Sequence, residues 1–376
     1  MLGWAVLADA VPIYPLYALL FIDSGLSGAQ ISALFAIWST VGLVVEVPSG
    51  TLADRYGRRA ALVAAGLLQA VGHAVWIGWP TFAGFALGFV LWGCGGSLVS
   101  GAREALLYDG LAAVGAADSY PQVNGWVHAT QLLAGLPAAA AATVLFVAGG
   151  FELVGVVSVA VCLAAAAVAT RLPEPPRTDP DDPDEPGYLA TLRAGVAEAA
   201  ARPGVPAALL AAALVGSLDA IEEYFPLITA DHGVSAAAVP LAMLPIGLAG
   251  AAGAALGGRT DRLGPFGLGA LLGASMLLFA GAGLVGHPAG LAAVVAFYGG
   301  YRAVLVVVDA RLQQRIASRS RATVTSVAGL GVDLACFLVY AAWAFDEVMA
   351  VAALGLLFAA ALPALLRPDR RRSRVG

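Results

Sequence analysis

Long apolar stretches separated by short polar turns dominate the chain. A membrane-spanning helix needs about 20 apolar residues to cross a hydrocarbon core of about 30 Å. We count twelve stretches of suitable length, at residues 2–22, 29–53, 60–79, 82–108, 122–147, 151–170, 205–229, 236–257, 266–285, 290–310, 322–344 and 348–366. The pattern predicts an all-α integral membrane protein with twelve transmembrane helices.

The composition supports a membrane protein and argues against several other classes. Hydrophobic residues make up 60% of the chain and charged residues 12%, whereas an ordinary soluble domain is about one quarter charged. The three cysteines lie inside apolar stretches without a CxxC pair, which argues against a disulfide framework or a thiolate metal site. The four histidines are scattered, and no nucleophile–base motif or phosphate-binding loop is present. We therefore expect no enzyme, no metal or other cofactor, and no nucleic-acid partner.

A proline-rich acidic segment divides the apolar stretches into six and six. The segment "RLPEPPRTDPDDPDEPG" (171–187) cannot build a packed core, so it predicts a solvated linker. The stretch 188–203 that follows predicts a short amphipathic helix on the membrane surface. The expected organisation is an N-terminal six-helix bundle at 1–170, a cytoplasmic linker at 171–203, a C-terminal six-helix bundle at 204–366 and a basic tail at 367–376 that binds anionic lipid headgroups.

The distribution of arginine predicts the orientation in the membrane. Short loops rich in positive charge stay on the cytoplasmic side. If residue 1 is cytoplasmic and twelve spans alternate, the outer loops hold no arginine and carry Asp23, Glu152, Asp231, Asp346 and Glu347 instead. We expect a multi-pass protein of the cytoplasmic (inner) membrane of a prokaryote, with both termini in the cytoplasm.

The two halves of the chain are related in sequence. Residues 23–57 recur in outline at 231–264, and "REALLYD" (103–109) is echoed by "RAVLVVVD" (302–309). Half-chain repeats of this kind are typical of secondary transporters, whose two bundles rock around a site near the middle of the membrane.

The stretch "GTLADRYGRR" (50–59) resembles the signature loop of the major facilitator superfamily, G-x-L-a-D-r-x-G-r-r. It lies after the second span, and a degraded copy, "GGRTDRLG" (257–264), lies after the eighth. With the repeated layout, the resemblance covers nearly the whole chain. It implies two pseudo-symmetric six-helix bundles and secondary active transport by alternating access.

The signature loop predicts a cytoplasmic gate. Gly50 and Gly57 permit close backbone approach and left-handed turns, and Asp54 and Arg58 are near enough in sequence to pair, with Asp109 joining them. In the family such a cluster is thought to latch the outward-facing state. The alternative is that the arginines only fix the topology. The complete predicted gate set is Gly50, Asp54, Arg55, Gly57, Arg58, Asp109, Asp261 and Arg262.

Acidic residues deep in the spans are candidates for proton coupling, because an intramembrane charge is costly unless it is paired or hydrated. Asp9, Asp219 and Asp333 fall about 12–20 Å from the cytoplasmic ends of their spans. Asp219, Glu222 and Glu223 have the i, i+3, i+4 spacing of one helix face, where mutual repulsion favours a proton on one of them. Alternatively the aspartates are buried structural acids, and the two glutamates lie solvated in an outer vestibule.

Other ionisable residues are expected to pair inside the membrane. Glu46 and Arg103 lie at similar depths, so we predict a pair between the second and fourth spans, or else that Arg103 extends to the headgroups. Arg302 is expected to pair with Asp309 or with Asp333. The predicted set is Glu46, Arg103, Glu104, Arg302 and Asp309.

The solute site is expected among apolar and aromatic side chains. Tyr14, Tyr17 and Phe21 are predicted to share one face of the first span, and His128 and Gln131 are polar candidates on the fifth. The interior lacks a ring of arginines to neutralise phosphate, so we expect a small amphiphilic organic solute as substrate. The other expected partners are protons and membrane lipids, and we expect a monomer.

The sequence departs from the pattern of drug:proton antiporters of the superfamily. Phe89 stands where these proteins usually carry an arginine, and 134–141 keeps only Gly135 and Pro137 of their fifth-span motif. These departures weaken the case for antiport. The leading hypothesis remains proton-coupled export, with proton-coupled import of a small metabolite as the alternative. A non-transporting sensor or lipid-handling protein on the same fold is the alternative from a different class.

Overall fold

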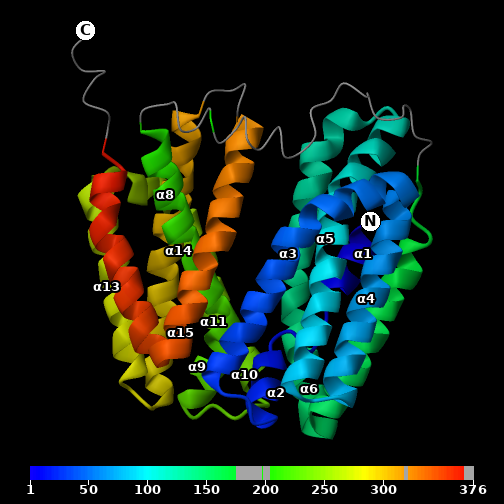
Figure 1. Ribbon diagram of the computed structural model, residues 1–376, viewed down its shortest axis with the longest axis horizontal. Coiled ribbons are helices and arrows are strands. Elements are labelled where there is room, and N and C mark those ends of the chain that lie inside the picture. The colour runs from blue at the N-terminus through cyan, green and yellow to red at the C-terminus, as the bar shows by residue number, and fades with distance from the viewer. Residues whose placement is uncertain (175–196, 198–203, 317–320, 368–376) are drawn as a thin grey trace. The chain divides into compact units, whose positions relative to one another are not determined.

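The computed structural model is built from helices and describes residues 1–174, 197, 204–316 and 321–367 (Figure 1). The amphipathic helix predicted at 188–203 lies outside the described residues except for residue 197, as does all of the predicted basic tail except its first residue. The helices group into two compact units. One takes in Met1–Pro183 and Ser235–Leu241, and the other takes in Asp184–Val234 and Ala242–Gly376.

The first unit is a bundle of long helices. Its elements are α1 (Leu2–Asp9), α2 (Tyr17–Asp23), α3 (Gly28–Tyr56), α4 (Arg58–Gly78), α5 (Phe82–Ala113), η1 (Ala117–Ser119) and α6 (Tyr120–Ala169). Helix α4 packs against α5 and α6, while α3 packs against α5 and α1 against α6. The backbone of α6 leaves helical geometry at Gly149 and Gly150, so α6 is two helices joined at a kink.

The first predicted span is broken in the structure. We expected one helix over 2–22, but α1 ends at Asp9 and α2 begins at Tyr17. Pro12 and Pro15 lie in the intervening turn, and proline lacks a backbone N–H and disfavours helical geometry in the residue before it. The N–H of Ile13 donates instead to the hydroxyl of Ser158 on α6, at 3.0 Å.

The second unit contains shorter helical pieces as well as long helices. Its helices are α8 (Val205–Gly216), η2 (Ser217–Tyr224), α9 (Phe225–Asp231), α11 (Leu244–Ala255), α12 (Gly257–Thr260), η3 (Asp261–Leu263), α13 (Gly264–Gly283), η4 (Pro288–Gly290), α14 (Leu291–Arg315) and α15 (Arg321–Leu365), and α10 (Val239–Ala242) lies at the boundary of the two units in sequence. Helix α15 is also two helices, joined at Asp346 and Glu347.

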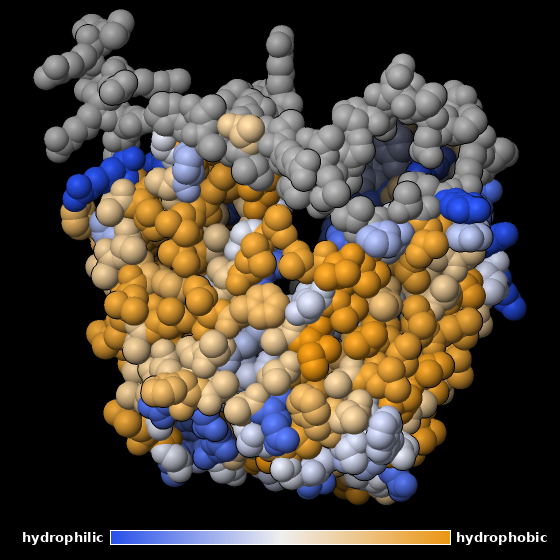
Figure 2. Space-filling view, in the orientation of Figure 1, coloured by the Kyte–Doolittle hydropathy of each residue, from blue (hydrophilic) through white to orange (hydrophobic). Residues whose placement is uncertain are grey.

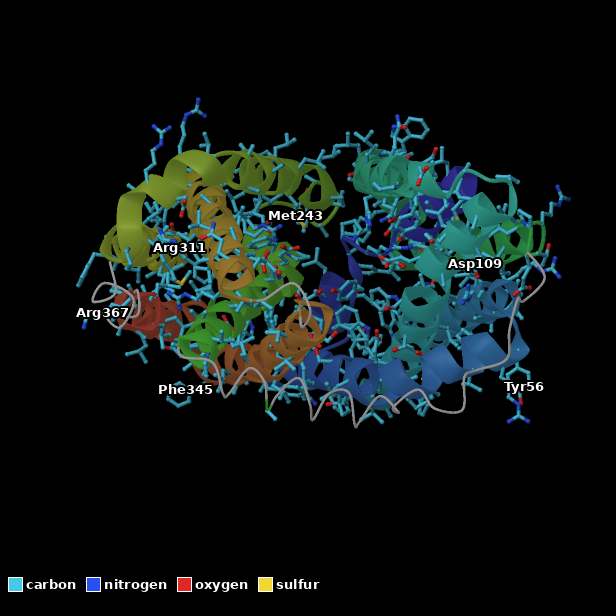
Figure 3. All side chains as sticks on the ribbon, turned by 90° about the horizontal axis from the view of Figure 1, so that it is seen from above. Tyr56, Asp109, Met243, Arg311, Phe345 and Arg367 are labelled. Atoms are coloured by element: carbon cyan, nitrogen blue, oxygen red, sulfur yellow. The ribbon has the colours of Figure 1, made fainter. Side chains whose placement is uncertain are left out.

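The helices account for the predicted membrane crossings. Eight helical segments of the described chain are long and apolar enough to span a membrane. Two of these segments contain the kinked α6 and α15, which make two crossings each, and the broken pair α1–α2 and the apolar segment Val239–Ala255 complete the twelve. Hydrophobic side chains cover most of the visible sides of the helices (Figure 2). Phe345, for example, is 88% exposed and points outward (Figure 3).

Aromatic rings fill the core of the first unit. Phe21 packs edge-to-face on Trp76 with ring centroids 5.3 Å apart, and Tyr17 packs likewise on Phe89 at 6.0 Å. Tyr17 is 5% exposed and Phe21 is fully buried. Both were predicted to line a solute cavity, and this is wrong, because they belong to the packed core.

Candidate functional site

A chain of hydrogen bonds links three helices of the first unit at Asp9. The Nε2 of Gln131 on α6 donates to Oδ2 of Asp9 at 2.6 Å. Arg103 on α5 donates from Nη1 to Oε1 of Gln131 at 3.1 Å. Because an amide can donate and accept at once, Gln131 connects the carboxylate of Asp9 to the guanidinium of Arg103. The sequence pointed to all three residues but not to this connection.

Arg103 does not form the predicted pair with Glu46. Its Nη2 lies 3.1 Å from Oε1 of Glu104, and its side chain is 15% exposed. Glu46 instead accepts a hydrogen bond from the hydroxyl of Ser100, at 2.9 Å. The side chain of Arg103 therefore points toward Gln131 within the bundle, while Glu46 lies exposed on α3.

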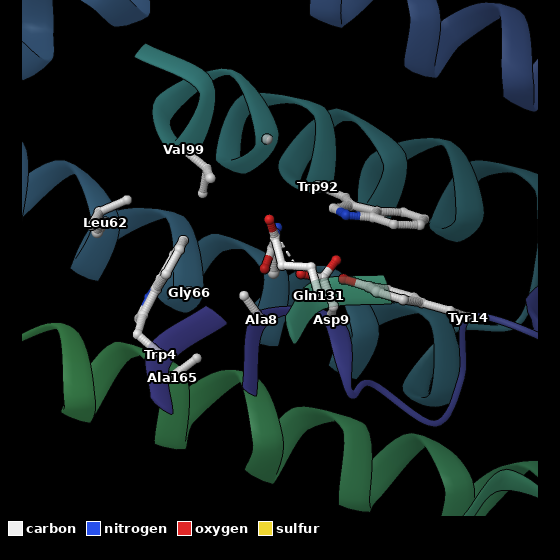
Figure 4. Close-up of a pocket in the computed structure, with 12 residues that line it drawn as sticks. Trp4, Ala8, Asp9, Tyr14, Leu62, Gly66, Trp92, Val99, Gln131 and Ala165 are labelled. Carbon is white, nitrogen blue, oxygen red and sulfur yellow. Dashed lines mark hydrogen bonds between the residues drawn. The ribbon is translucent and has the colours of Figure 1, made fainter. Parts of the chain in front are cut away.

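A cavity of about 230 Å³ lies beside Asp9, inside the first unit (Figure 4). Its lining residues are Trp4, Ala8, Asp9, Tyr14, Leu62, Gly66, Gln69, Trp92, Gly96, Val99, Gln131 and Ala165. Asp9 is the one charged residue among them. Tyr14 and Trp92 stack with ring centroids 5.0 Å apart and an interplanar angle of 11°. The structure thus places Asp9, which was predicted as a coupling acid, beside Tyr14 and Gln131, which were predicted as cavity residues. It adds Trp4, Gln69 and Trp92, which the sequence did not single out as cavity residues.

The second unit carries a direct acid–arginine cluster. Arg302 on α14 places Nη1 2.9 Å from Oδ1 of Asp219 and 3.6 Å from Oε1 of Glu222. The hydroxyl of Tyr301 donates to Oδ1 of Asp219 at 2.9 Å, and the hydroxyl of Tyr298 donates to Glu222. One guanidinium and two phenols therefore hold two carboxylates. The tyrosines were not predicted, although Tyr298 precedes Arg302 by four positions and so shares its side of α14.

The predicted partners of Arg302 were wrong. Among the described residues its ion pairs are with Asp219 and Glu222, and not with Asp309 or Asp333. Asp309 is seven positions further along the same helix, or about 10 Å along its axis, and both predicted partners are exposed.

The grouping of the three neighbouring acids also differs from the prediction. Asp219, Glu222 and Glu223 lie in η2, which is a 3₁₀-helix and not an α-helix. Residues i and i+3 eclipse each other in a 3₁₀-helix. This geometry aligns Glu222 with Asp219 at Arg302, and turns Glu223 to a different side.

The signature loop forms part of the predicted gate. Arg58, the first residue of α4, donates to Oδ2 of Asp109 on α5. The side chain of Asp54 lies outside the described part of the structure, so its predicted contact with Arg58 stays a prediction. Arg55 lies beside Tyr56, with its guanidinium carbon 5.5 Å from the ring centroid.

The two glycines of the signature loop, Gly57 and Gly50, differ in the space around them. Gly57 has φ of +107° between α3 and α4, and a Cβ added there would lie 2.9 Å from Oε1 of Glu174. Glu174 also lies close to Arg59, with Oε2 3.7 Å from Nε. The close approach predicted for Gly50 is wrong, because Gly50 lies inside α3 and an added Cβ would meet no described atom within 4 Å.

The second copy of the loop makes a matching ion pair of reversed polarity. Asp261 in η3 accepts from Nε of Arg311 on α14 at 3.1 Å, and Arg311 also donates to the backbone carbonyl of Asp261 at 3.0 Å. Asp109 and Arg311 can be located in Figure 3. Arg262 is exposed and forms no ion pair within the described chain. Arg311 was missed, although it lies only two positions beyond the repeat that ends at Asp309.

His128 is exposed on α6, one turn before Gln131, and its role as a cavity residue stays a prediction. His73 is fully buried, with Nδ1 3.5 Å from the sulfur of Cys162.

Comparison with known proteins identifies the architecture. A family model described as Major Facilitator Superfamily matches residues 1–340. A bacterial homolog to the human lysosomal transporter Spinster, in an inward-facing and occupied conformation, superposes with a TM-score of 0.72 at 16% identity, covering 97% of this chain and 91% of that chain. The nucleoside transporter NupG gives a TM-score of 0.71 at 12% identity, covering 96% of both chains. A D-xylose-proton symporter gives 0.63 at 17% identity, covering 96% of this chain and 94% of that chain. Comparison with curated protein sequences gives no match.

Proposed function

Because the chain belongs to the Major Facilitator Superfamily, we propose that this multi-pass membrane transporter is proton-coupled, and that one acid–arginine cluster in each half carries the coupling. The observation that supports this proposal is a repeated arrangement. Asp9 and Asp219 come from the first predicted span of their halves, and Arg103 and Arg302 open the repeated segments "REALLYD" and "RAVLVVVD". Asp219 meets Arg302 directly, and Asp9 meets Arg103 through Gln131.

The chemistry of these clusters suits proton transfer coupled to movement. A carboxylate in the membrane is stabilised by a nearby guanidinium, and protonation removes the negative charge on which that attraction depends. In the second unit, protonation of Asp219 leaves Arg302 with Glu222 as its acidic partner. In the first unit, protonation of Asp9 weakens the hydrogen bond from Gln131. Each event changes the free energy of one arrangement of helices relative to another, as a coupling site requires.

The ion pairs at the signature loops are proposed to bias the same equilibrium. Arg58 and Asp109 have side chains 27% and 46% exposed, and Arg311 and Asp261 are 15% and 54% exposed. Partly exposed ion pairs of this kind each stabilise the conformation in which they form by about 0.2–1 kcal/mol. Such a contribution is small enough for the pair to break in every cycle, which suits a reversible latch better than a permanent brace.

The substrate proposed is a small amphiphilic organic solute, exported across the cytoplasmic membrane with both termini in the cytoplasm. An apolar cavity wall with one acid and two amides supports an amphiphile over a phosphorylated solute. Import of a small metabolite is the second candidate, because one structural neighbour is a D-xylose-proton symporter. That likeness concerns the fold, at 17% identity.

Transport assays in inverted membrane vesicles test the proposal. Ethidium serves as the amphiphilic probe and D-xylose as the metabolite probe, each with the pH gradient imposed and dissipated. We expect gradient-dependent ethidium accumulation, which Asp219→Asn abolishes while downhill exchange persists. Asp309→Asn, which replaces an exposed acid on the helix of Arg302, is the matched control. Accumulation that is equal with and without the gradient, or unchanged in Asp219→Asn, would overturn proton coupling.

A further inference from the structure

The cavity of the first unit presents a carboxylate with spare hydrogen-bonding capacity. Oδ2 of Asp9 accepts from Gln131, which is the one hydrogen-bond partner of Asp9 among the described residues. A carboxylate can accept about four hydrogen bonds. Asp9 lines the cavity directly (Figure 4), so the remaining capacity is available to a molecule inside it.

The electrostatic character of the cavity is negative. Arg103, the nearest arginine in the hydrogen-bonded chain, is not among the lining residues. Gln131 stands between its guanidinium and Asp9, and Glu104 lies 3.1 Å from it on the other side. The guanidinium of Arg103 interacts electrostatically with Asp9 from behind the amide, but the charge that lines the cavity is the carboxylate. An anion in the cavity would therefore be repelled by Asp9 at close range, whereas a cation would be attracted to it.

Aromatic rings flank the carboxylate. Tyr14 and Trp92 lie on one side of Asp9 and Trp4 lies on the other (Figure 4). Aromatic side chains attract cations through their negative faces, and tryptophan does so most strongly. The volume of about 230 Å³ is below the roughly 300–1,000 Å³ of pockets for drug-sized ligands. The cavity therefore suits a small ligand.

From these observations we propose that the cavity binds a small organic cation, a quaternary or protonated amine with an apolar body, and that Asp9 is its counter-ion. The inference rests on the proposed transport function and narrows its solute class from amphiphile to organic cation. Proton and cation then compete for one carboxylate, so cation binding releases a proton from Asp9 and protonation releases the cation.

One glycine allows the cavity to be filled without disturbing the fold. Gly96 lines the cavity, and a Cβ added there would meet no described atom within 4 Å. A leucine at this position would project into open space. Gly66 is less suitable, because its added Cβ would lie 3.0 Å from the Cβ of Ala166. Gly281 on α13 of the other unit is also free of neighbours within 4 Å, so Gly281→Leu is the matched control.

The test is calorimetric binding to the full-length protein in lipid nanodiscs. The probe is benzyltrimethylammonium, and phenylacetate is the anionic comparison. We expect benzyltrimethylammonium to bind at alkaline pH and to bind more weakly at acidic pH, where Asp9 is neutralised. Asp9→Asn and Gly96→Leu should each weaken binding at least about tenfold, equivalent to 1.4 kcal/mol, while Gly281→Leu binds like the parent. Absence of cation binding, equal binding of phenylacetate, or unchanged binding in Gly96→Leu would overturn the proposal.

Binding is measured without a pH gradient, so its failure is separable from failure of the proposed transport function. If the protein accumulates ethidium in a gradient-dependent way but does not bind benzyltrimethylammonium, the proposed proton coupling stands and the proposed cation site is wrong. If the protein binds the cation through Asp9 but shows no gradient-dependent transport, the cation site stands and the proposed coupling is wrong.

Discussion

Arg302 and Asp219 are 83 positions apart in sequence and 2.9 Å apart in space, whereas their counterparts Arg103 and Asp9 are joined through the amide of Gln131. The two halves therefore use the same residue types with different connections. A direct ion pair responds to protonation of its own carboxylate. A bridged pair depends in addition on the amide, which makes Gln131 the residue that distinguishes the halves.

Replacement of Gln131 tests the bridge. Gln131→Ala removes the hydrogen bonds to both Asp9 and Arg103, and hydrogen bonds to charged groups are worth about 1.5–3 kcal/mol. We expect gradient-driven ethidium transport to fall at least about tenfold with normal expression. Leu133→Ala, two positions later and 63% exposed on the same helix, should transport like the parent. Equal effects of the two substitutions would contradict a specific role for the amide.

A double-mutant cycle tests the latch at the signature loop. Arg58→Ala and Asp109→Asn each break the same pair, so their effects on transport rate should be non-additive, with a coupling energy of up to about 1 kcal/mol. The cycle of Arg311→Ala with Asp261→Asn should behave alike. Arg262→Ala, which changes an exposed arginine of the same loop copy, should show no coupling to Asp261→Asn. Strict additivity of the first cycle would favour arginines that only set the topology.

The glycine between α3 and α4 should be intolerant of substitution. Gly57→Ala forces a side chain onto φ of +107° and against the carboxylate of Glu174, and strained backbone of this kind costs about 1–3 kcal/mol. Thermal unfolding in detergent should show a lower midpoint than the parent. Gly50→Ala should leave the midpoint unchanged or raise it slightly, because Gly50 is inside a helix with no described neighbour within 4 Å. Adding Glu174→Ala to Gly57→Ala should raise the unfolding midpoint part of the way back to that of the parent. The second substitution removes the clash with the Glu174 carboxylate but leaves the backbone strain at position 57.

Cysteine labelling tests the orientation predicted from arginine. In a background without Cys94, Cys162 and Cys336, a cysteine at Asp23 or Asp231 should react with a membrane-impermeant thiol reagent added to intact cells. A cysteine at Arg262 should react only in inverted vesicles. All three positions are exposed in the structure, so a failure to react reports the side of the membrane and not burial. Labelling of position 262 in intact cells would reverse the predicted topology.

The sequence alone determined the architecture of this protein. The cost of placing a residue in hydrocarbon depends mostly on that residue and its near neighbours, so the apolar stretches, the six-and-six division and the signature loop were readable without coordinates. The same logic picked out Asp9, Arg103, Asp219 and Arg302, because a charge in an apolar stretch is conspicuous wherever it points.

Only the tertiary structure decided which of these charges meet. Pairing depends on how each helix is rotated about its axis, and faces rich in alanine and glycine carry little hydropathy contrast from which to infer that rotation. The expected partners of Arg103 and Arg302 were therefore wrong, and the bridging amide and the tyrosines at Asp219 went unconnected. Local backbone geometry mattered in the same way. Two prolines interrupt the first span, and Tyr14, which lies between them, stacks on Trp92. A 3₁₀ turn places Glu222 beside Asp219. In both cases a change of a few tens of degrees per residue redirects a side chain that sequence spacing had assigned to another face.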